Sequence, residues 1–309
     1  MKQLFLLLLL SLSALKVFSQ MESHSNQWSS NIQHFNSAVV GLYPSFEAKS
    51  QYRMQWVGFD GAPRTSRISV IAPLVKKMKL YELTRHGIGV SMETDRVAAF
   101  SVNKFQFQYG IHLRLKHKHR LSFGLSAGAF QMGYNPDKVE TYYPDPSVKT
   151  QSSFVKPYTN IGSIVSGERY AAGLSVNHFI PTKWDKIGLN SNYSTEIVLF
   201  GKYAIQIHEY YNLIPSVLIK NTFNAPFLIE VNSKLNYLNR IFTMVGWRLN
   251  RSMYAGMEFR ISKKWNLAYT FEYGIAKFDN FLFSSHEFGL CFRLPNKVIE
   301  PGYEHKTAF

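Results

Sequence analysis

FNSAVVGLYPSFEAKSQYRMQWVGFDGAPRTSRISVIAPL, residues 35–74, contains the strand–turn–strand pattern from which the rest of the chain can be interpreted. In its first arm, residues 52–57, apolar and polar side chains alternate, as they do in a strand with two unlike faces. One face carries Tyr52, Met54 and Trp56, and the other carries Arg53 and Gln55. This arm predicts a strand with one apolar and one polar face.

A turn and a second arm complete the pattern. Asp60-Gly61 accommodates a positive φ at low cost, and Pro63 cannot donate a hydrogen bond to a neighbouring strand, so residues 58–63 predict a turn. In the second arm, residues 64–72, Ile68 and Val70 alternate with more polar neighbours, although Ile71 falls on the polar face. The whole stretch therefore predicts a β-hairpin.

Two later segments show longer alternation. Residues 105–115 place six apolar side chains on one face, and residues 265–276 place five aromatic or apolar side chains on one face. A tilted strand needs about 9–11 residues to cross a bilayer. No run after residue 20 approaches the roughly 18 consecutive apolar residues of a membrane helix. With 15% aromatic residues and 18% charged residues, these patterns predict an all-β transmembrane barrel.

We predict an antiparallel up-and-down barrel of about 14 strands, with 12–16 as the plausible range. An even number returns both termini to the periplasm. On that orientation the long segments 135–157 and 180–192 lie outside, and the short turns 116–120, 167–168, 208–209 and 262–264 lie in the periplasm. The predicted strands are 52–57, 64–72, 87–94, 105–115, 121–134, 159–165, 169–179, 193–206, 211–222, 227–237, 240–250, 253–261, 265–276 and 284–294.

The two ends of the chain differ from the barrel. Residues 1–19 combine Lys2, an apolar core and a small-residue end, which predicts a cleaved signal peptide. Residues 20–45 have few strand signals and predict either a periplasmic arm or an inserted plug. The barrel is expected over residues 46–294. Residues 295–309 contain two prolines and predict a periplasmic tail.

The formal net charge of +15 narrows the classes of partner. Nucleic-acid binding is not expected, because the chain is exported and has no compact basic motif. The partners that fit the positive charge are anionic outer-membrane lipid, including lipopolysaccharide, and an acidic protein. The single cysteine, Cys291, cannot form an internal disulfide and is expected to face the lumen as a small residue.

A search for catalytic or metal-binding residues yields little. His112, His117 and His119 are close in sequence, but only the last two share a face and the surrounding lysines and arginines would repel a cation. No nucleophile–base set or phosphate loop is present, so neither an enzyme nor a cofactor site is predicted. Charges do fall on the predicted lumen face, where pairing is expected because an unpaired buried charge is costly. Besides Arg53, they are Arg114, Arg248, Glu258, Arg260, Glu272, Glu287 and Arg293.

Three motifs of the opening stretch resemble the N-terminal signature of the PorP/SprF family, which are outer-membrane proteins of the type IX secretion system of Bacteroidetes. They are FNSAVVG (35–41), YRMQW (52–56) and GAPRT (61–65), and later segments such as HGIGVSMETD (86–95) and SHEFGLCFRL (285–294) follow in the family's order. Ser37 replaces the proline usual in the first motif. The matching signature residues are Phe35, Tyr52, Arg53, Gln55, Trp56, Gly61, Pro63 and Thr65.

The resemblance implies a non-enzymatic role in protein secretion and, in gliding bacteria, in gliding motility. A barrel of this kind is expected to dock or anchor secreted cargo or an adhesin through the cargo's C-terminal domain. It is also expected to contact other secretion components, including peptidoglycan-linked proteins. The signature residues serve either such contacts or the first hairpin and its seam with the last strand. The alternative function is an outer-membrane channel for small solutes, since a barrel of this width conducts unless it is plugged.

Overall fold

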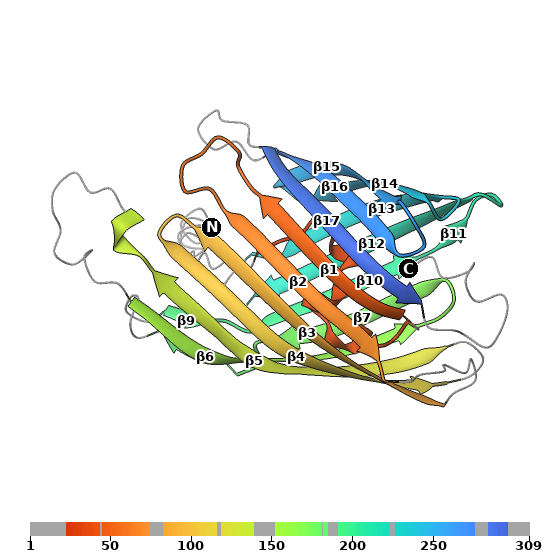
Figure 1. Ribbon diagram of the computed structural model, residues 1–309, viewed down its shortest axis with the longest axis horizontal. Coiled ribbons are helices and arrows are strands. Elements are labelled where there is room, and N and C mark those ends of the chain that lie inside the picture. Colours follow the sequence, from red (N-terminus) through yellow and green to blue (C-terminus); the bar gives the residue numbers. More distant parts are fainter. Residues whose placement is uncertain are drawn as a thin grey trace, which may run out of the picture.

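In the computed structural model, fourteen antiparallel strands form a closed ring, each strand hydrogen-bonded to its neighbours in the chain (Figure 1). The ring closes where β1 pairs with β17. The predicted all-β up-and-down barrel of about 14 strands is therefore confirmed. The barrel strands are β1 (Ser45–Met54), β2 (Arg64–Pro73), β3 (Thr84–Val97), β4 (Phe100–Arg114), β5 (Arg120–Tyr134), β6 (Ser152–Ser166), β7 (Tyr170–Asn177), β10 (Glu196–Tyr203) with its continuation β11 (Ile205–Gln206), β12 (Tyr211–Thr222), β13 (Leu228–Tyr237), β14 (Ile241–Arg248), β15 (Ser252–Arg260), β16 (Trp265–Gly274) and β17 (Ser284–Pro295).

The structure describes residues 23–43, 45–74, 83–115, 119–138, 152–180, 182–184, 191–222, 226–275 and 284–295. The predicted signal peptide, His117 and nearly all of the predicted tail lie outside these ranges. Within them, β10 and β11 both pair with β12 and count as one strand interrupted at Ala204. Two short strands, β8 (Thr182–Trp184) and β9 (Ser191–Tyr193), pair only with each other. The remaining elements are the 3₁₀ helices η1 (Trp28–Ser30), η2 (Ile32–His34), η3 (Ser37–Val39) and η4 (Pro136–Lys138), none of which is long and apolar enough to cross a membrane.

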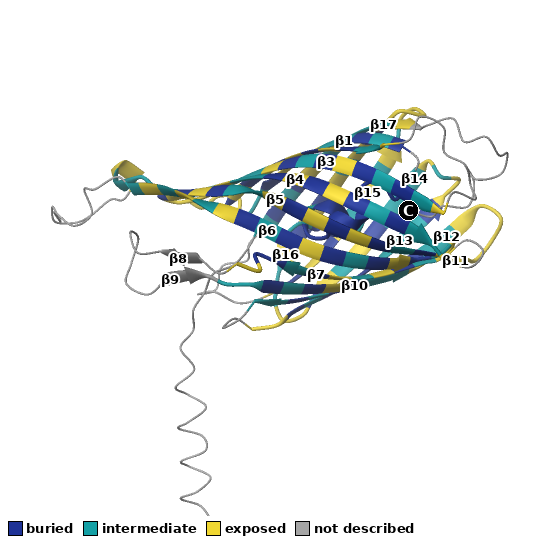
Figure 2. Ribbon diagram, turned by 90° about the horizontal axis from the view of Figure 1, so that it is seen from below, coloured by how far each residue is buried: buried dark blue, intermediate teal, exposed yellow. Residues whose placement is uncertain are grey.

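Burial in this barrel is the reverse of that in a water-soluble protein. The exposed outer face is largely apolar, whereas most of the buried side chains facing the lumen are polar or charged. Along most barrel strands, buried residues alternate with exposed or half-buried ones (Figure 2). On β4, for example, Phe107 is 61% exposed, whereas its neighbours Gln106 and Gln108 are buried. The alternation predicted for residues 105–115 and 265–276 is confirmed.

Several predicted strand boundaries are wrong, and the largest errors are at the starts of β1 and β6. β1 begins at Ser45, not at Tyr52, and its lumen-facing positions include Glu47 and Gln51. A strand whose buried face is charged lacks the apolar alternation that usually reveals a strand. β6 begins at Ser152, inside the predicted loop 135–157, and includes Pro157. That proline is tolerated because β6 pairs with β7 only from Asn160 onward, which leaves an open edge beside Pro157.

The two ends of the barrel carry different connections. At one end, here called the loop end, the connections are 55–63, 98–99, 135–151, 178–195, 223–227, 249–251 and 275–283. At the other, called the turn end, they are 74–83, 115–119, 167–169, 207–210, 238–240 and 261–264. The loop end therefore carries most of the long connections, and β1 starts at the turn end.

Candidate functional site: a charged lumen filled by an N-terminal plug

The segment of residues 23–43, here called the plug, lies inside the ring of strands (red in Figure 1). Its apolar side chains pack against lumen-facing residues of β2, β6, β7, β10 and β12 in one buried cluster. Phe35, for example, meets Phe200 edge to face with ring centroids 5.8 Å apart. Ile71, which interrupted the polar face of the first hairpin, belongs to this cluster. The plug thus gives the lumen an apolar core that the strands alone lack.

A row of four glycines supports the plug. Gly87, Gly110, Gly124 and Gly162 are direct register partners on β3, β4, β5 and β6. A Cβ at any of them would overlap plug atoms of residues 36–41. Next to the row, His112 on β4 contacts the Val40 carbonyl oxygen through Nε2 at 2.9 Å. Only a strip without side chains lets the plug backbone lie directly on the sheet.

Gly124→Ala tests this packing. The added methyl group would overlap the backbone of Ser37 and Ala38, and overpacking of this kind costs about 1–3 kcal/mol. We expect faster chymotrypsin cleavage at Trp28 and Phe35 in the purified variant, measured by mass spectrometry. Gly201→Ala is the matched control, because its new Cβ would meet only Val217, at an ordinary 3.7 Å. Equal cleavage of both variants would contradict a tightly seated plug.

The plug is also held by a buried ion network at the loop-end half of the lumen. Arg53 bridges Glu272 (2.6 Å) and Glu287 (3.1 Å). Arg248 bridges Glu272 (2.7 Å) and Glu230 (2.9 Å). These groups come from β1, β13, β14, β16 and β17, so the network joins strands across the β1–β17 seam.

Plug atoms complete this network. The Ser25 hydroxyl donates to Glu287 at 2.5 Å, and the backbone N–H of Asn26 donates to the same carboxylate at 2.8 Å. Arg248 donates to the Asn26 side chain at 3.0 Å. A carboxylate that is almost fully buried needs several donors, and here the plug supplies two of them.

A second set of charges meets the start of the plug from β2, β3 and β4. Arg67 pairs with Glu93 at 2.7 Å and also donates to the Ser23 carbonyl oxygen at 2.9 Å. Lys104 lies 3.4 Å from the same glutamate. Burial, and then the nearby Arg67 charge, lower the pKa of plug residue His34 to about 3, so its imidazole is neutral beside the guanidinium.

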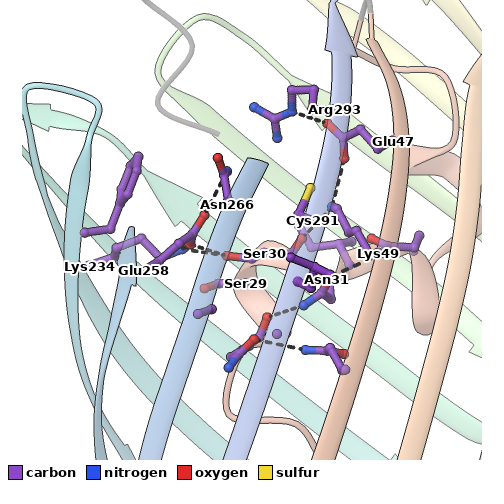
Figure 3. A pocket seen from close by; sticks show the side chains of 18 of the residues that line it. Ser29, Ser30, Asn31, Glu47, Lys49, Lys234, Glu258, Asn266, Cys291 and Arg293 are labelled. Carbon is purple, nitrogen blue, oxygen red and sulfur yellow. Dashed lines mark hydrogen bonds and ion pairs between the residues drawn. The ribbon is translucent and has the colours of Figure 1, made fainter. Parts of the chain in front are cut away.

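A third set surrounds a cavity of about 120 Å³ between the plug and the wall toward the turn end (Figure 3). Lys49 donates to the Ser30 carbonyl oxygen at 2.8 Å, and Lys234 donates to the Ser30 hydroxyl at 2.5 Å. Lys234 also pairs with Glu258 at 3.0 Å. Glu47 pairs with Lys49 and with Arg293, each at 2.9 Å. Strands from opposite parts of the ring thus converge on η1.

The eight signature residues occupy three kinds of position. Phe35, Arg53 and Thr65 are buried in the lumen, where Thr65 donates to Asp95 at 2.7 Å. Tyr52 and Trp56 are exposed. The first turn contains Gln55, Gly61 and Pro63. The backbone N–H of Gln55 donates to the Pro63 carbonyl oxygen, and Gly61 has a positive φ of 72°. The structure therefore does not bring the signature together as one surface.

The predicted lumen charges are divided among these sets. Arg248, Glu272 and Glu287 meet in the loop-end network, whereas Glu258, Arg260 and Arg293 line the cavity with Cys291. Arg114, the last residue of β4, is half-buried and in neither group. Of the histidines, His112 is buried and His119 is exposed beside Tyr170. Among the described residues no group of three His, Cys, Asp or Glu could hold a metal ion.

Sequence reasoning missed Glu47, Lys49, Lys202, Glu230 and Lys234 as lumen residues. It also missed the glycine row, although the signal was present: four successive strands each carry a glycine on the lumen face. Such a row indicates close backbone approach, and the apolar residues of positions 32–42 were available to fill it.

The family model described as "Type IX secretion system membrane protein PorP/SprF" matches residues 17–292. No curated protein sequence matches the chain.

Solved barrels are similar in fold. The CymD monoaromatic hydrocarbon channel has a TM-score of 0.55 at 9% identity, covering 88% of this chain and 93% of that one. The P. putida toluene transporter TodX has a TM-score of 0.51 at 10% identity, covering 86% and 93%. Omp33 of Acinetobacter baumannii has a TM-score of 0.51 at 7% identity, covering 82% and 100%. At such low identity these similarities establish the barrel fold alone.

Proposed function

The chain belongs to the PorP/SprF family of type IX secretion system membrane proteins, and from that premise we propose that it acts by binding. In this proposal the barrel docks or anchors a secreted cargo or adhesin at its loop end, through the cargo's C-terminal domain. At its turn end it contacts periplasmic secretion components, some of them linked to peptidoglycan. The family is one of secretion-system membrane barrels, and the proposed mechanism involves no catalytic step.

The filled lumen carries this proposal. The plug packs its apolar side chains against the wall and shares the ion network, so residues 23–43 occupy the space that a channel would leave to water. A barrel closed by its own chain is suited to holding a partner rather than to passing solute. The alternative function as a channel is supported only by the similarity in fold to hydrocarbon channels. That similarity does not indicate a substrate for this protein.

We place the protein in the outer membrane with both termini periplasmic, which puts the loop end outside. The apolar outer face fits a bilayer. Residues 1–19 then act as the export signal, residues 20–45 as the plug, residues 46–294 as the barrel and residues 295–309 as a periplasmic tail.

Exposed apolar side chains on the loop end fit a protein partner. Trp56 and Phe59 in the first loop are 45% and 49% exposed, and Phe179 and Phe227 stand exposed elsewhere on this rim. Aromatic side chains dominate binding energy at protein interfaces. The first loop also continues the β1–β17 seam, because the Val57 amide bonds the Ser284 carbonyl oxygen at 3.0 Å, so signature residue Trp56 joins the seam to the rim.

Deleting the gene in its host and comparing secreted and surface proteomes tests the function. We expect loss of cargo from the surface, many proteins if the barrel serves the whole system and one large adhesin if it is dedicated. Complementation with a Trp56→Ala/Phe59→Ala variant should lower cargo retention roughly fivefold, which corresponds to a loss of about 1 kcal/mol over the two aromatic contacts together.

The control for this complementation is Val217→Ala/Val245→Ala, which truncates exposed apolar side chains in the middle of β12 and β14, away from both ends of the barrel. Equal losses in both variants would argue against docking at the loop end. An unchanged surface with altered solute uptake in the deletion strain would overturn the secretion role and leave the channel.

A further inference from the structure

The cavity beside η1 has an excess of positive charge. Five cationic side chains line it against two carboxylates, Glu47 and Glu258, which leaves a formal excess of three positive charges. The loop-end network differs, because two arginines there face three glutamates and leave one negative charge in excess. The cations of the cavity are Lys49, Lys202, Lys234, Arg260 and Arg293.

Ion pairs and plug contacts use only part of this charge. Glu47 is shared by Lys49 and Arg293, and Glu258 is paired with Lys234. Lys202 also contacts the plug, where its Nζ donates to the Ser29 carbonyl oxygen at 3.5 Å. Arg260 lies over the Phe242 ring, 5.9 Å from its centroid. Because partly buried charge is costly unless it is neutralised, the excess favours an anion in the cavity.

The cavity also offers a hydrogen-bond donor. The buried hydroxyl of Ser29, which lines it, has no hydrogen-bond partner among the residues that the structure describes. The volume of about 120 Å³ holds several water molecules or one group of a few heavy atoms. The cavity reaches the turn end, since Asn239 of turn 238–240 lines it and the Arg293 side chain is 28% exposed.

We propose that this cavity binds a small oxyanion, a phosphate or carboxylate group, held between the wall lysines and the Ser29–Ser30 corner of the plug. Lys234 and Arg260, from β13 and β15, provide the charge, and the Ser29 hydroxyl donates to one oxygen. Arg260 and Arg293 stand at the mouth. The bound anion joins plug to wall and reduces the repulsion among the cations, so it tightens the closed state.

Isothermal titration of the purified full-length barrel in zwitterionic detergent tests the site. The probes are inorganic phosphate and succinate, added at constant ionic strength in chloride buffer. We expect saturable one-to-one binding of at least one probe; binding of phosphate alone or of succinate alone identifies the preferred group. Heats that do not saturate, or that chloride reproduces at equal concentration, would overturn the proposal as simple screening.

Two variants and a control sharpen this experiment. Lys202→Met and, separately, Arg260→Gln should each weaken binding by roughly tenfold or more, the loss expected for one hydrogen bond to a charged group. Arg260 is the safer variant for folding, because its guanidinium lies over the ring of Phe242 on the wall strand β14. Lys264→Gln changes an exposed lysine of turn 261–264 outside the cavity and should leave the affinity unchanged. Unaltered affinity in both cavity variants would exclude this site.

Discussion

Removing residues 23–40 should convert a silent barrel into a conducting one. Eight-stranded barrels are filled by their own side chains, whereas barrels of 16–18 strands leave an aqueous channel. This 14-stranded barrel lies between them, and its lumen is filled with the help of the plug. We expect steady open-channel current in planar bilayers from the deletion variant and no steady current from the full-length protein.

The current through the deletion variant should also be anion-selective. The cations that line the cavity toward the turn end outnumber the carboxylates there, and charge of one sign along a pore attracts ions of the opposite sign. The reversal potential in a potassium chloride gradient measures this preference. A folded deletion variant that stays silent would mean that wall side chains close the lumen unaided. Current through the full-length protein equal to that of the deletion variant would instead favour the channel function.

Arg248→Met should cause the largest loss of stability among single substitutions in the lumen. The guanidinium pairs with Glu230 and Glu272 and bonds the plug residue Asn26, and its side chain is only 4% exposed. Removing it takes the guanidinium partner from buried Glu230 and one of two guanidinium partners from buried Glu272. Breaking a buried pair in this way costs about 3–5 kcal/mol. The measurement is urea unfolding of the barrel in detergent, followed by gel mobility and by the fluorescence of its tryptophans.

A triple variant, Arg248→Met with Glu230→Gln and Glu272→Gln, separates charge from packing. It should recover much of the lost stability, because neutral amides need no buried counter-charge. Arg240→Met, at an exposed position in turn 238–240, is the surface control and should change stability by less than about 0.5 kcal/mol. A loss at Arg240 as large as that at Arg248 would show that the buried network has no special role.

The sequence by itself determined the class of fold and the number of strands. Alternation with a period of two is a local property, so segments such as 105–115 and 265–276 display their lipid-facing and lumen-facing sides without knowledge of any neighbour. Prediction was weaker where that contrast fades. The predicted start of β1 lies too far along the chain because the lumen face of this strand is charged. The predicted start of β6 lies too far along the chain because Pro157 suggested a loop.

Only the tertiary structure decided what fills the barrel and which charges meet. Arg53 and Glu287 are 234 positions apart and come together because β1 closes the ring against β17. The plug has no regular period, and its apolar residues find their partners on five separate strands. The glycine row becomes a binding strip only when four strands align in register. Such contacts depend on ring closure and register, which are long-range properties, whereas the strand pattern depends on adjacent residues alone.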